Sequence, residues 1–335
     1  MNHPTLKSLT LGIGLFFTLP LVYANSSFPS LSDGTLYINK SKTRKVAPVK
    51  YGFHYEEIGM MGEGALHAEL IRNRSFEEAT PPAGLSVKNG LYENVPAPRV
   101  KEKKVFQADP LIGWATYPLS YTPVFISRTE ENPMSKENKY SMLVNVTEDI
   151  ANHPDALILN RGYYGMNLKT DTSYRLSLFL KSRNYSAPLR VFLVDELGQR
   201  VSNVIEVNIE NRDWTKYTGE LKPEKNVQRG MLAIQPMSKG QFQIDVVSLF
   251  PSDTWNEGKS VFRKDIVQNL KEFAPSFIRF PGGCIVHGVN EETMYHWKKT
   301  LGPIENRPGQ WSKWAPYYRT DGIGYHEFYE LCEYV

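Results

Sequence analysis

The residue with the clearest chemical demand is Arg279, which lies inside the apolar run Phe277-Ile278-Arg279-Phe280. Such a run is typical of a buried strand, and a buried guanidinium must be paired with an anion. A carboxylate would satisfy it, either beside a functional pocket or in a purely structural ion pair. Gly282 and Gly283 follow directly and would let the backbone pass close to a ligand.

Cysteine and histidine give no comparable signal. Cys284 and Cys332 are too few for a disulfide framework, and they are either two buried thiols or one bridge. A catalytic cysteine would need a partner base that the sequence does not place. The histidines lack metal-ligand spacing, and Gly282-Gly283 lacks the residues of a phosphate-binding loop. The sequence therefore predicts no metal and no cofactor.

The composition is typical of a folded protein. The length predicts more than a single small domain. The chain has 335 residues with a formal net charge of +3, and its basic residues are scattered, so no nucleic-acid partner is predicted. It contains 19 Tyr, 6 Trp and 16 Phe, which suit sugar-stacking surfaces and β cores equally well. Composition alone thus indicates carbohydrate only weakly.

The first residues have the pattern of an export signal. Lys7 precedes an apolar run from Leu9 to Val22, and Val22-Tyr23-Ala24 carries small or aliphatic residues at the positions read for cleavage. The run is shorter than the roughly 20 residues that span a bilayer, so no stable membrane anchor is predicted. Residues 1–24 are interpreted as a signal peptide, which places the protein in the periplasm or outside the cell.

The middle of the chain alternates with the period of β-strands. Apolar residues recur at every second position between about 105 and 250, and turn residues separate the runs at sandwich-like intervals. The flanks differ, because Phe262, Ile266, Leu270 and Phe273 have helical spacing between a possible N-cap, Ser260, and a closing proline. A second amphipathic helix is indicated by Phe328, Leu331, Cys332 and Val335.

This order of elements predicts an α/β plus all-β chain. The segment around Gly52–Glu56 would be a first barrel strand and Phe277–Phe280 a second, with the β block inserted between them. A (β/α)8 TIM barrel needs roughly 200 residues or more, and the flanks supply fewer. The prediction is an incomplete N-terminal part of such a barrel, divided into residues 25–100, an insertion at 101–252 and a barrel start at 253–335.

Several ordered blocks resemble the α-L-arabinofuranosidases of glycoside hydrolase family 51. The strongest is Phe277-Ile278-Arg279-Phe280-Pro281-Gly282-Gly283-Cys284, and the others lie at 64–77, 247–251, 295–298, 301–303, 307–309 and 320–328. The resemblance implies that the insertion is a jelly-roll β-sandwich of carbohydrate-binding type. It also implies a retaining mechanism with two carboxylates about 5 to 5.5 Å apart. In the family these glutamates lie beyond the last of the matching blocks, so the catalytic pair is expected after Val335.

The resemblance assigns substrate-binding roles to three residues. Glu56 matches a family glutamate that accepts hydrogen bonds from sugar hydroxyls, Arg279 matches an arginine beside the pocket, and Cys284 lines the pocket where other members have Asn or Cys. From the residues alone, Glu56 is equally a surface carboxylate or a rim ion pair. Trp297 and Trp311 would either stack on sugar or pack as lids, whereas Tyr163 and Tyr164 are interpreted as packing residues of the insertion.

The resulting hypothesis is an exported enzyme that releases terminal α-L-arabinofuranosyl units from arabinose-containing plant polysaccharides or oligosaccharides. Family members often form oligomers, and the sequence does not fix a number. The alternative, from another class, is a non-catalytic polysaccharide-binding protein whose partial barrel is vestigial. A third interpretation is an inactive fragment.

Overall fold

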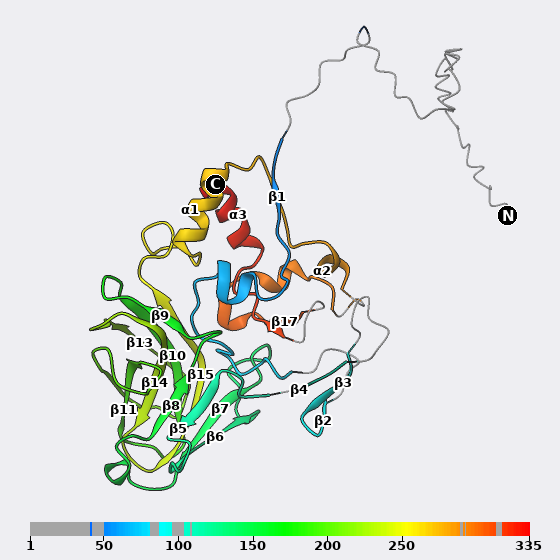
Figure 1. Ribbon diagram of the computed structural model, residues 1–335. Helices are drawn as coiled ribbons and strands as arrows, with labels where there is room; N and C mark the ends of the chain where they lie inside the picture. Colours follow the sequence, from blue (N-terminus) through cyan, green and yellow to red (C-terminus); the bar gives the residue numbers. More distant parts are fainter. Residues whose placement is uncertain are drawn as a thin grey trace, which may run out of the picture. The chain divides into compact units, whose positions relative to one another are not determined.

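The computed structural model describes residues 41, 50–80, 87–95, 104–107, 109–288, 291, 293–312 and 317–335. The predicted signal peptide at 1–24 lies outside these residues. Most of the described chain is β-sheet, with few helices. Residues 114–251 form two antiparallel sheets, which we call the two-sheet region, and the segments before and after it form a smaller α/β part (Figure 1).

The first sheet of the two-sheet region has five strands in the order β13-β10-β15-β7-β6. In β10 the alternating Leu176, Leu178 and Leu180 are buried, while the residues between them, Ser177 and Phe179, are less so. That alternation is what a strand with one face in a core requires. The strands are β6 (Val124–Thr129), β7 (Ser141–Val146), β10 (Tyr174–Ser182), β13 (Thr215–Leu221) and β15 (Gly240–Pro251).

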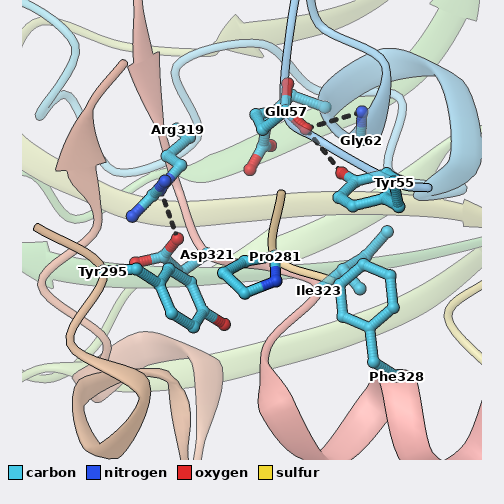
Figure 2. Close-up of a pocket in the computed structure, with 10 residues that line it drawn as sticks. Tyr55, Glu57, Gly62, Pro281, Tyr295, Arg319, Asp321, Ile323 and Phe328 are labelled. Atoms are coloured by element: carbon cyan, nitrogen blue, oxygen red, sulfur yellow. Dashed lines mark hydrogen bonds and ion pairs between the residues drawn. The ribbon is translucent and has the colours of Figure 1, made fainter. Parts of the chain in front are cut away.

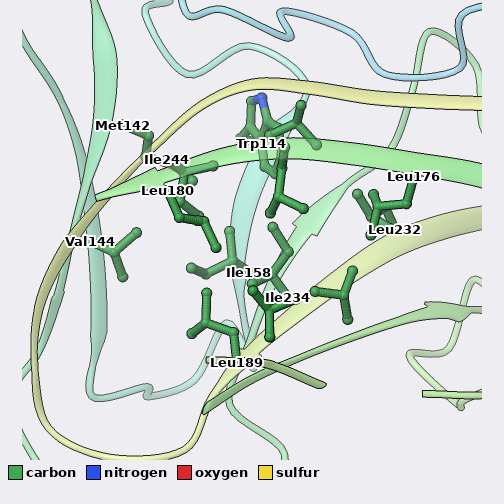
Figure 3. Close-up of a cluster of buried hydrophobic side chains, with 14 of the residues drawn as sticks. Trp114, Met142, Val144, Ile158, Leu176, Leu180, Leu189, Leu232, Ile234 and Ile244 are labelled. Carbon is green, nitrogen blue, oxygen red and sulfur yellow. The ribbon is translucent and has the colours of Figure 1, made fainter. Parts of the chain in front are cut away.

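The second sheet has the order β12-β11-β14-β8-β5, and β9 pairs separately with β14. The strands are β5 (Trp114–Tyr117), β8 (Leu157–Asn160), β9 (Met166–Leu168), β11 (Pro188–Val194), β12 (Ile205–Asn208) and β14 (Val227–Pro236). Inward side chains of both sheets share one hydrophobic core, as Figure 3 shows for Val144, Leu176 and Ile244 of one sheet with Ile158 and Leu232 of the other. The predicted β block is therefore confirmed as sheet.

The α/β part begins with two short parallel strands. Strand β1 (Phe53–His54) pairs with β16 (Ile278–Arg279), although the whole two-sheet region separates them in sequence. Helices α1 (Lys264–Phe273) and α3 (Tyr325–Tyr334) lie beside each other in this part (Figure 1). Phe328 and Leu331 of α3 join Tyr55 and Phe262 in a second buried cluster. The pairing of β1 with β16 fixes where the segments after both strands meet.

The remaining elements are short. They are η1 (Gly62–Leu66), β2 (Val87–Lys88), β3 (Leu91–Val95), β4 (Lys104–Gln107), η2 (Ile150–Asn152), α2 (Cys284–His287), η3 (Trp297–Thr300), η4 (Ile304–Asn306), β17 (Gln310–Trp311) and β18 (Tyr318–Arg319). None of the helices in the described part of the chain has the length and apolar character that a membrane span requires.

Two local predictions need correction. Ser260 is not the N-cap of α1, because its hydroxyl accepts a bond from the backbone N–H of Phe262 and the helix begins at Lys264. The strand around Arg279 is not fully buried, since Phe277 is 53% exposed and Arg279 lies on the surface. Among the described residues β16 pairs only with β1, so this strand lacks the cover that a central strand would have.

The segment after η1 is joined to β15, the last strand of the two-sheet region, at one buried carboxylate, that of Glu69. Its Oε1 accepts bonds from the backbone N–H groups of Ile71 at 3.0 Å and Leu249 at 2.8 Å, and Ser248 donates to Oε2. Leu70 also bonds directly to Leu249 through its backbone N–H at 3.1 Å. The last strand of the region is thus fastened to the segment that follows η1.

Candidate functional site

Glu56 occupies the point where the two parallel strands end. The backbone N–H of Tyr55 donates to the carbonyl of Arg279 at 2.9 Å, which continues the β1–β16 ladder by one residue. Glu56 follows, and its Oε1 accepts a bond of 3.0 Å from the backbone N–H of Ile285. Only 9% of Glu56 is exposed. The carboxylate is therefore held at the carboxyl ends of the strands, which is where barrel enzymes of this strand arrangement bind ligands.

Gly282 provides the space that Glu56 occupies. A Cβ added at Gly282 would lie 2.3 Å from Cγ of Glu56, and the backbone at Gly282 has φ of +141°. Both observations require glycine, because a side chain would be strained and would collide with Glu56. A Cβ at Gly283 would lie 3.2 Å from Oε2 of Glu56, so both glycines border the carboxylate. The backbone of this pair therefore passes close to Glu56, whereas its approach to a ligand stays a prediction.

The three predicted site residues do not share one environment. Cys284 is a half-buried free thiol at the start of α2, one residue before the N–H that binds Glu56. Arg279 is exposed, and within the described part of the chain no hydrogen bond or ion pair involves its guanidinium. The prediction that Arg279 is a buried, paired guanidinium is wrong. The structure brings Glu56 and the Cys284 segment together and leaves the side chain of Arg279 at the surface.

A buried acidic network, which sequence reasoning missed, lies next to Glu56. Glu57 accepts hydrogen bonds from Tyr55 Oη at 2.7 Å, Tyr317 Oη at 2.9 Å and the backbone N–H of Gly62 at 2.7 Å. Figure 2 shows Glu57, Tyr55 and Gly62 on one side of a small pocket. Burial raises the pKa of Glu57, and these three bonds oppose the rise. Glu57 therefore ties β1 to the segment that contains β18.

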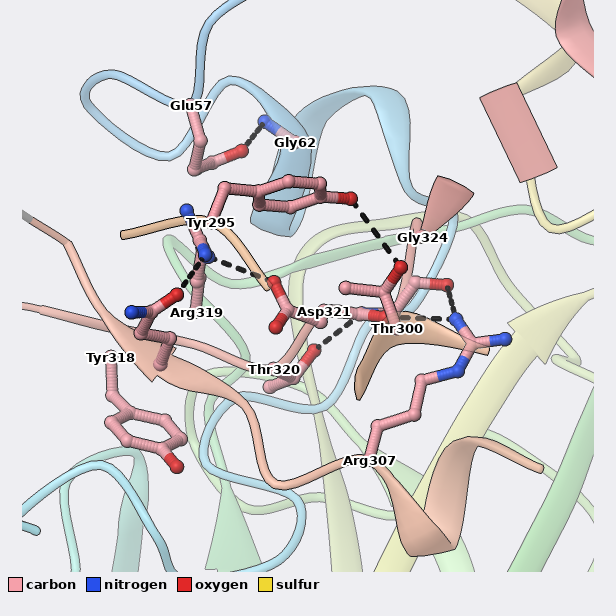
Figure 4. A network of polar contacts seen from close by, with 12 residues as sticks. Glu57, Gly62, Tyr295, Thr300, Arg307, Tyr318, Arg319, Thr320, Asp321 and Gly324 are labelled. Atoms are coloured by element: carbon pink, nitrogen blue, oxygen red, sulfur yellow. Dashed lines mark hydrogen bonds and ion pairs between the residues drawn. The ribbon is translucent and has the colours of Figure 1, made fainter. Parts of the chain in front are cut away.

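The other side of that pocket carries an ion pair. Arg319 Nε lies 2.8 Å from Asp321 Oδ1, and each side chain is 6% exposed (Figure 2). Burial raises the pKa of Asp321, and the positive charge of Arg319 opposes this shift. Tyr295 places its ring over the Arg319 guanidinium, 5.1 Å from it. Carboxylates, phenols and a guanidinium therefore line the pocket wall within a network of internal bonds (Figure 4).

Glu63 connects the pocket to the two-sheet region. Its Oε1 accepts a bond from the backbone N–H of Thr320 at 2.8 Å, and its Oε2 accepts one from Tyr163 Oη at 3.3 Å. Burial and the nearby charge of Glu57 raise the pKa of Glu63 from 4.5 to about 7. Tyr163 also packs against Gly64, so its predicted packing role is confirmed.

The raised pKa of Glu63 predicts a specific pH dependence of stability. Between about pH 4.5 and 7 the folded state holds a proton on Glu63 that the unfolded state has released, so stability falls as pH rises through this window. We expect Glu63→Gln to remove up to about 1.4 kcal/mol per pH unit of that slope. Urea unfolding at several pH values measures it. The exposed Glu196, changed to Gln, is the control, and an unchanged slope in Glu63→Gln would contradict the assignment.

The other aromatic side chains discussed from the sequence differ in burial. Trp311 is 9% exposed and buried, which favours packing. Trp297 is 44% exposed, and its ring lies 5.2 Å from that of Tyr325. Tyr164 is 83% exposed, so its interpretation as a packing residue is wrong. It lies in the turn between β8 and β9, whose backbone directs this side chain outward while Tyr163 points inward.

One sequence signal could have found Glu57. Adjacent residues of an extended segment point to opposite sides. If Glu56 faces the strand ends, Glu57 must face the interior, and a buried carboxylate there needs donors. The residues that supply them, at 317–321, are far along the chain, and no spacing rule indicates that they meet Glu57.

Comparison with known proteins finds that this chain is similar to arabinofuranosidases. The profile of the family described as "Alpha-L-arabinofuranosidase 1 domain" matches residues 269–335. The structure superposes on an arabinose-bound GH51 α-L-arabinofuranosidase with a TM-score of 0.68 and 24% identity, over 85% of this chain and 42% of that chain. The described fold is therefore that of an α-L-arabinofuranosidase.

Curated relatives agree with the profile. Alpha-L-arabinofuranosidase 1 of Arabidopsis thaliana is 28% identical over 87% of this chain and 39% of its own length. The extracellular exo-alpha-L-arabinofuranosidase of Streptomyces chartreusis is 26% identical over 88% of this chain and 32% of its own length. The chain spans about two fifths or less of these relatives. It is an α-L-arabinofuranosidase-like protein, as its sequence blocks predicted.

Proposed function

We propose that this chain forms the substrate-holding part of an exported glycoside hydrolase, a retaining α-L-arabinofuranosidase. Its substrates would be arabinose-containing plant polysaccharides and oligosaccharides, from which it releases terminal non-reducing α-L-arabinofuranosyl residues. The observation that carries the proposal is the position of Glu56, whose carboxylate is fixed at the ends of β1 and β16 against Gly282, Gly283 and the N–H of Ile285. The similarity to proteins named arabinofuranosidases supports it.

The proposed layout is a (β/α)8 barrel that starts with β1 and β16. The two-sheet region would be a jelly roll inserted after the first barrel strand, within residues 101–252, and the barrel would resume at 253–335. The parallel β1–β16 pair and the helix that precedes β16 support this layout, because a barrel strand is preceded by a helix and pairs in parallel. Further strands would extend the sheet beyond β16.

In the proposed mechanism Glu56 binds substrate and takes no part in bond cleavage. A carboxylate has about four acceptor positions, and the bond from Ile285 helps to hold this one in place. Sugar hydroxyls would donate to the carboxylate and fix the glycone. Two glutamates after Val335 would act as the nucleophile at the anomeric carbon and as the acid that protonates the leaving oxygen, and water would then release arabinose. We place Cys284 at the pocket wall and propose that Arg279 contacts a residue supplied by the rest of the barrel.

Hydrolysis of p-nitrophenyl α-L-arabinofuranoside tests the proposal. The purified chain is assayed beside a form extended through the downstream reading frame. Activity in the extended form alone is expected. Activity in the short chain would overturn the placement of the catalytic pair, and inactivity of both, with binding of arabinan retained, would support a polysaccharide-binding protein instead.

A further inference from the structure

A groove rich in lysine lies between the two-sheet region and the loop after β16. It has a volume of about 690 Å³ and opens to solvent. Lys136 and Lys139 line it from the loop between β6 and β7, and Lys298 and Lys299 line it from η3. All four lysines are exposed. The groove is thus larger than a single sugar requires and carries cations on two opposite segments.

Most of this positive charge is not neutralised by neighbouring side chains. Lys136 lies 3.2 Å from Glu137, whereas no ion pair of Lys139, Lys298 or Lys299 occurs in the described ranges. The second acidic lining residue, Glu77, has its Oε1 engaged by the backbone N–H groups of Lys139 at 2.8 Å and Tyr140 at 3.0 Å. Three ammonium groups are therefore available to an anionic partner.

Two of the segments that line the groove follow the parallel strands β1 and β16. Lys298 and Lys299 belong to the segment that follows β16, and Glu77 and Thr80 to the segment that follows β1. Glu56 itself is two residues beyond the end of β1. In parallel α/β structures the segments after the carboxyl ends of the strands form the substrate face. The groove would therefore lie on the same face as Glu56.

From this geometry we infer that the groove binds a uronate-bearing segment of the polysaccharide. The inference rests on the proposed function, because it extends the substrate of the same site to a backbone that carries carboxylates. Lysine is a compact, hydrated point charge, which suits single carboxylates spaced along a flexible chain. Arginine, whose planar fork matches phosphate in two-point contacts, does not occur among the described residues that line this groove. The presence of lysine rather than arginine, together with the position on the substrate face, favours a uronate polymer over a nucleic acid.

Binding of polygalacturonate to the purified chain tests the inference. The comparison ligands are fully methyl-esterified pectin, which lacks the charges, neutral linear arabinan and duplex DNA. We expect polygalacturonate to bind, esterification to abolish binding and 0.5 M salt to weaken it, because exposed charges are screened. Lys298→Glu with Lys299→Glu is expected to weaken binding about tenfold. Lys222→Glu with Lys239→Glu, which adds the same charge outside the groove, is the control.

The outcomes separate this inference from the proposed function. Equal binding of esterified pectin, equal loss in the control variant, or tighter binding of DNA would each overturn the uronate assignment. If the reversed charges prevent folding, Lys298→Gln with Lys299→Gln, checked by its melting temperature, provides the same comparison. If the extended form hydrolyses the arabinofuranoside but does not bind polygalacturonate, the uronate assignment is wrong and the proposed function still holds. Binding of polygalacturonate without hydrolysis would support the uronate assignment of the groove and contradict the proposed enzymatic activity.

Discussion

Replacing Gly282 with alanine is expected to reduce kcat/KM of the extended enzyme about a hundredfold, because a displacement of 1 Å at a substrate-holding group has that effect. The new Cβ would lie 2.3 Å from Glu56 Cγ, so the Glu56 side chain must move. The positive φ adds strain, and together these effects should lower the free energy of unfolding by about 2 to 5 kcal/mol. Calorimetric melting and arabinofuranoside kinetics measure the two effects.

Gly302 is the matched control for this substitution. Its φ is +80°, yet nothing lies within 4 Å of an added Cβ. Gly302→Ala should therefore show the backbone strain, roughly 1 to 2 kcal/mol, without the collision. Wild-type kinetics in Gly282→Ala would mean that Glu56 does not hold the substrate, and equal destabilisation in both variants would mean that the contact with Glu56 is unimportant.

Breaking the buried pair of Arg307 and Glu327 is expected to cost about 3 to 5 kcal/mol of stability. Arg307 Nη2 donates to Glu327 Oε1 at 2.6 Å, Nη1 donates to Oε2 at 3.1 Å, and the two side chains are 5% and 12% exposed. Arg307 also donates to the carbonyl of Asp321 at 2.9 Å (Figure 4). Arg307→Met would leave a carboxylate buried without its counter-ion. Urea unfolding measures the loss.

An exposed pair on the two-sheet region gives the comparison. Arg190 Nε lies 3.0 Å from Glu206 Oε1, with side chains 43% and 55% exposed, and Arg190→Met should cost less than about 1 kcal/mol. In the buried pair, adding Glu327→Gln to Arg307→Met should cost less than the sum of the two single changes, since it removes the stranded charge. Additive losses would show that the two side chains act independently.

The sheets could be predicted because their signal is local. Leu176, Leu178 and Leu180 recur at every second position, and that period alone indicates a strand with one buried face. The end of α1 before Pro275 is equally local, since proline disfavours helix in the residue before it. The start of α1 was mispredicted because Ser260 caps nothing when its hydroxyl is engaged by Phe262 two residues on.

The candidate site was less predictable because it depends on contacts between distant segments. Glu56 could be singled out by resemblance to a family block, and the two glycines by their type. Burial of Arg279 was inferred from its apolar neighbours, but burial depends on which strands lie beside it, and the described part of the chain covers only one side of β16. The Glu57 and Glu63 contacts with 317–321 follow from tertiary packing alone.

The junction at Glu69 has a consequence for the order of folding. The bond from the N–H of Leu249 to Glu69 joins residues 180 positions apart, and it forms where the two-sheet region closes. A chain that must bring β1 to β16 directly faces the entropy of closing a very long loop. Once the two sheets have assembled and Leu249 is bonded to Glu69, that loop is reduced to the two segments from His54 to Glu69 and from Leu249 to Ile278. The two-sheet region would thus act as an internal template, and the parallel pair that positions Glu56 would form last.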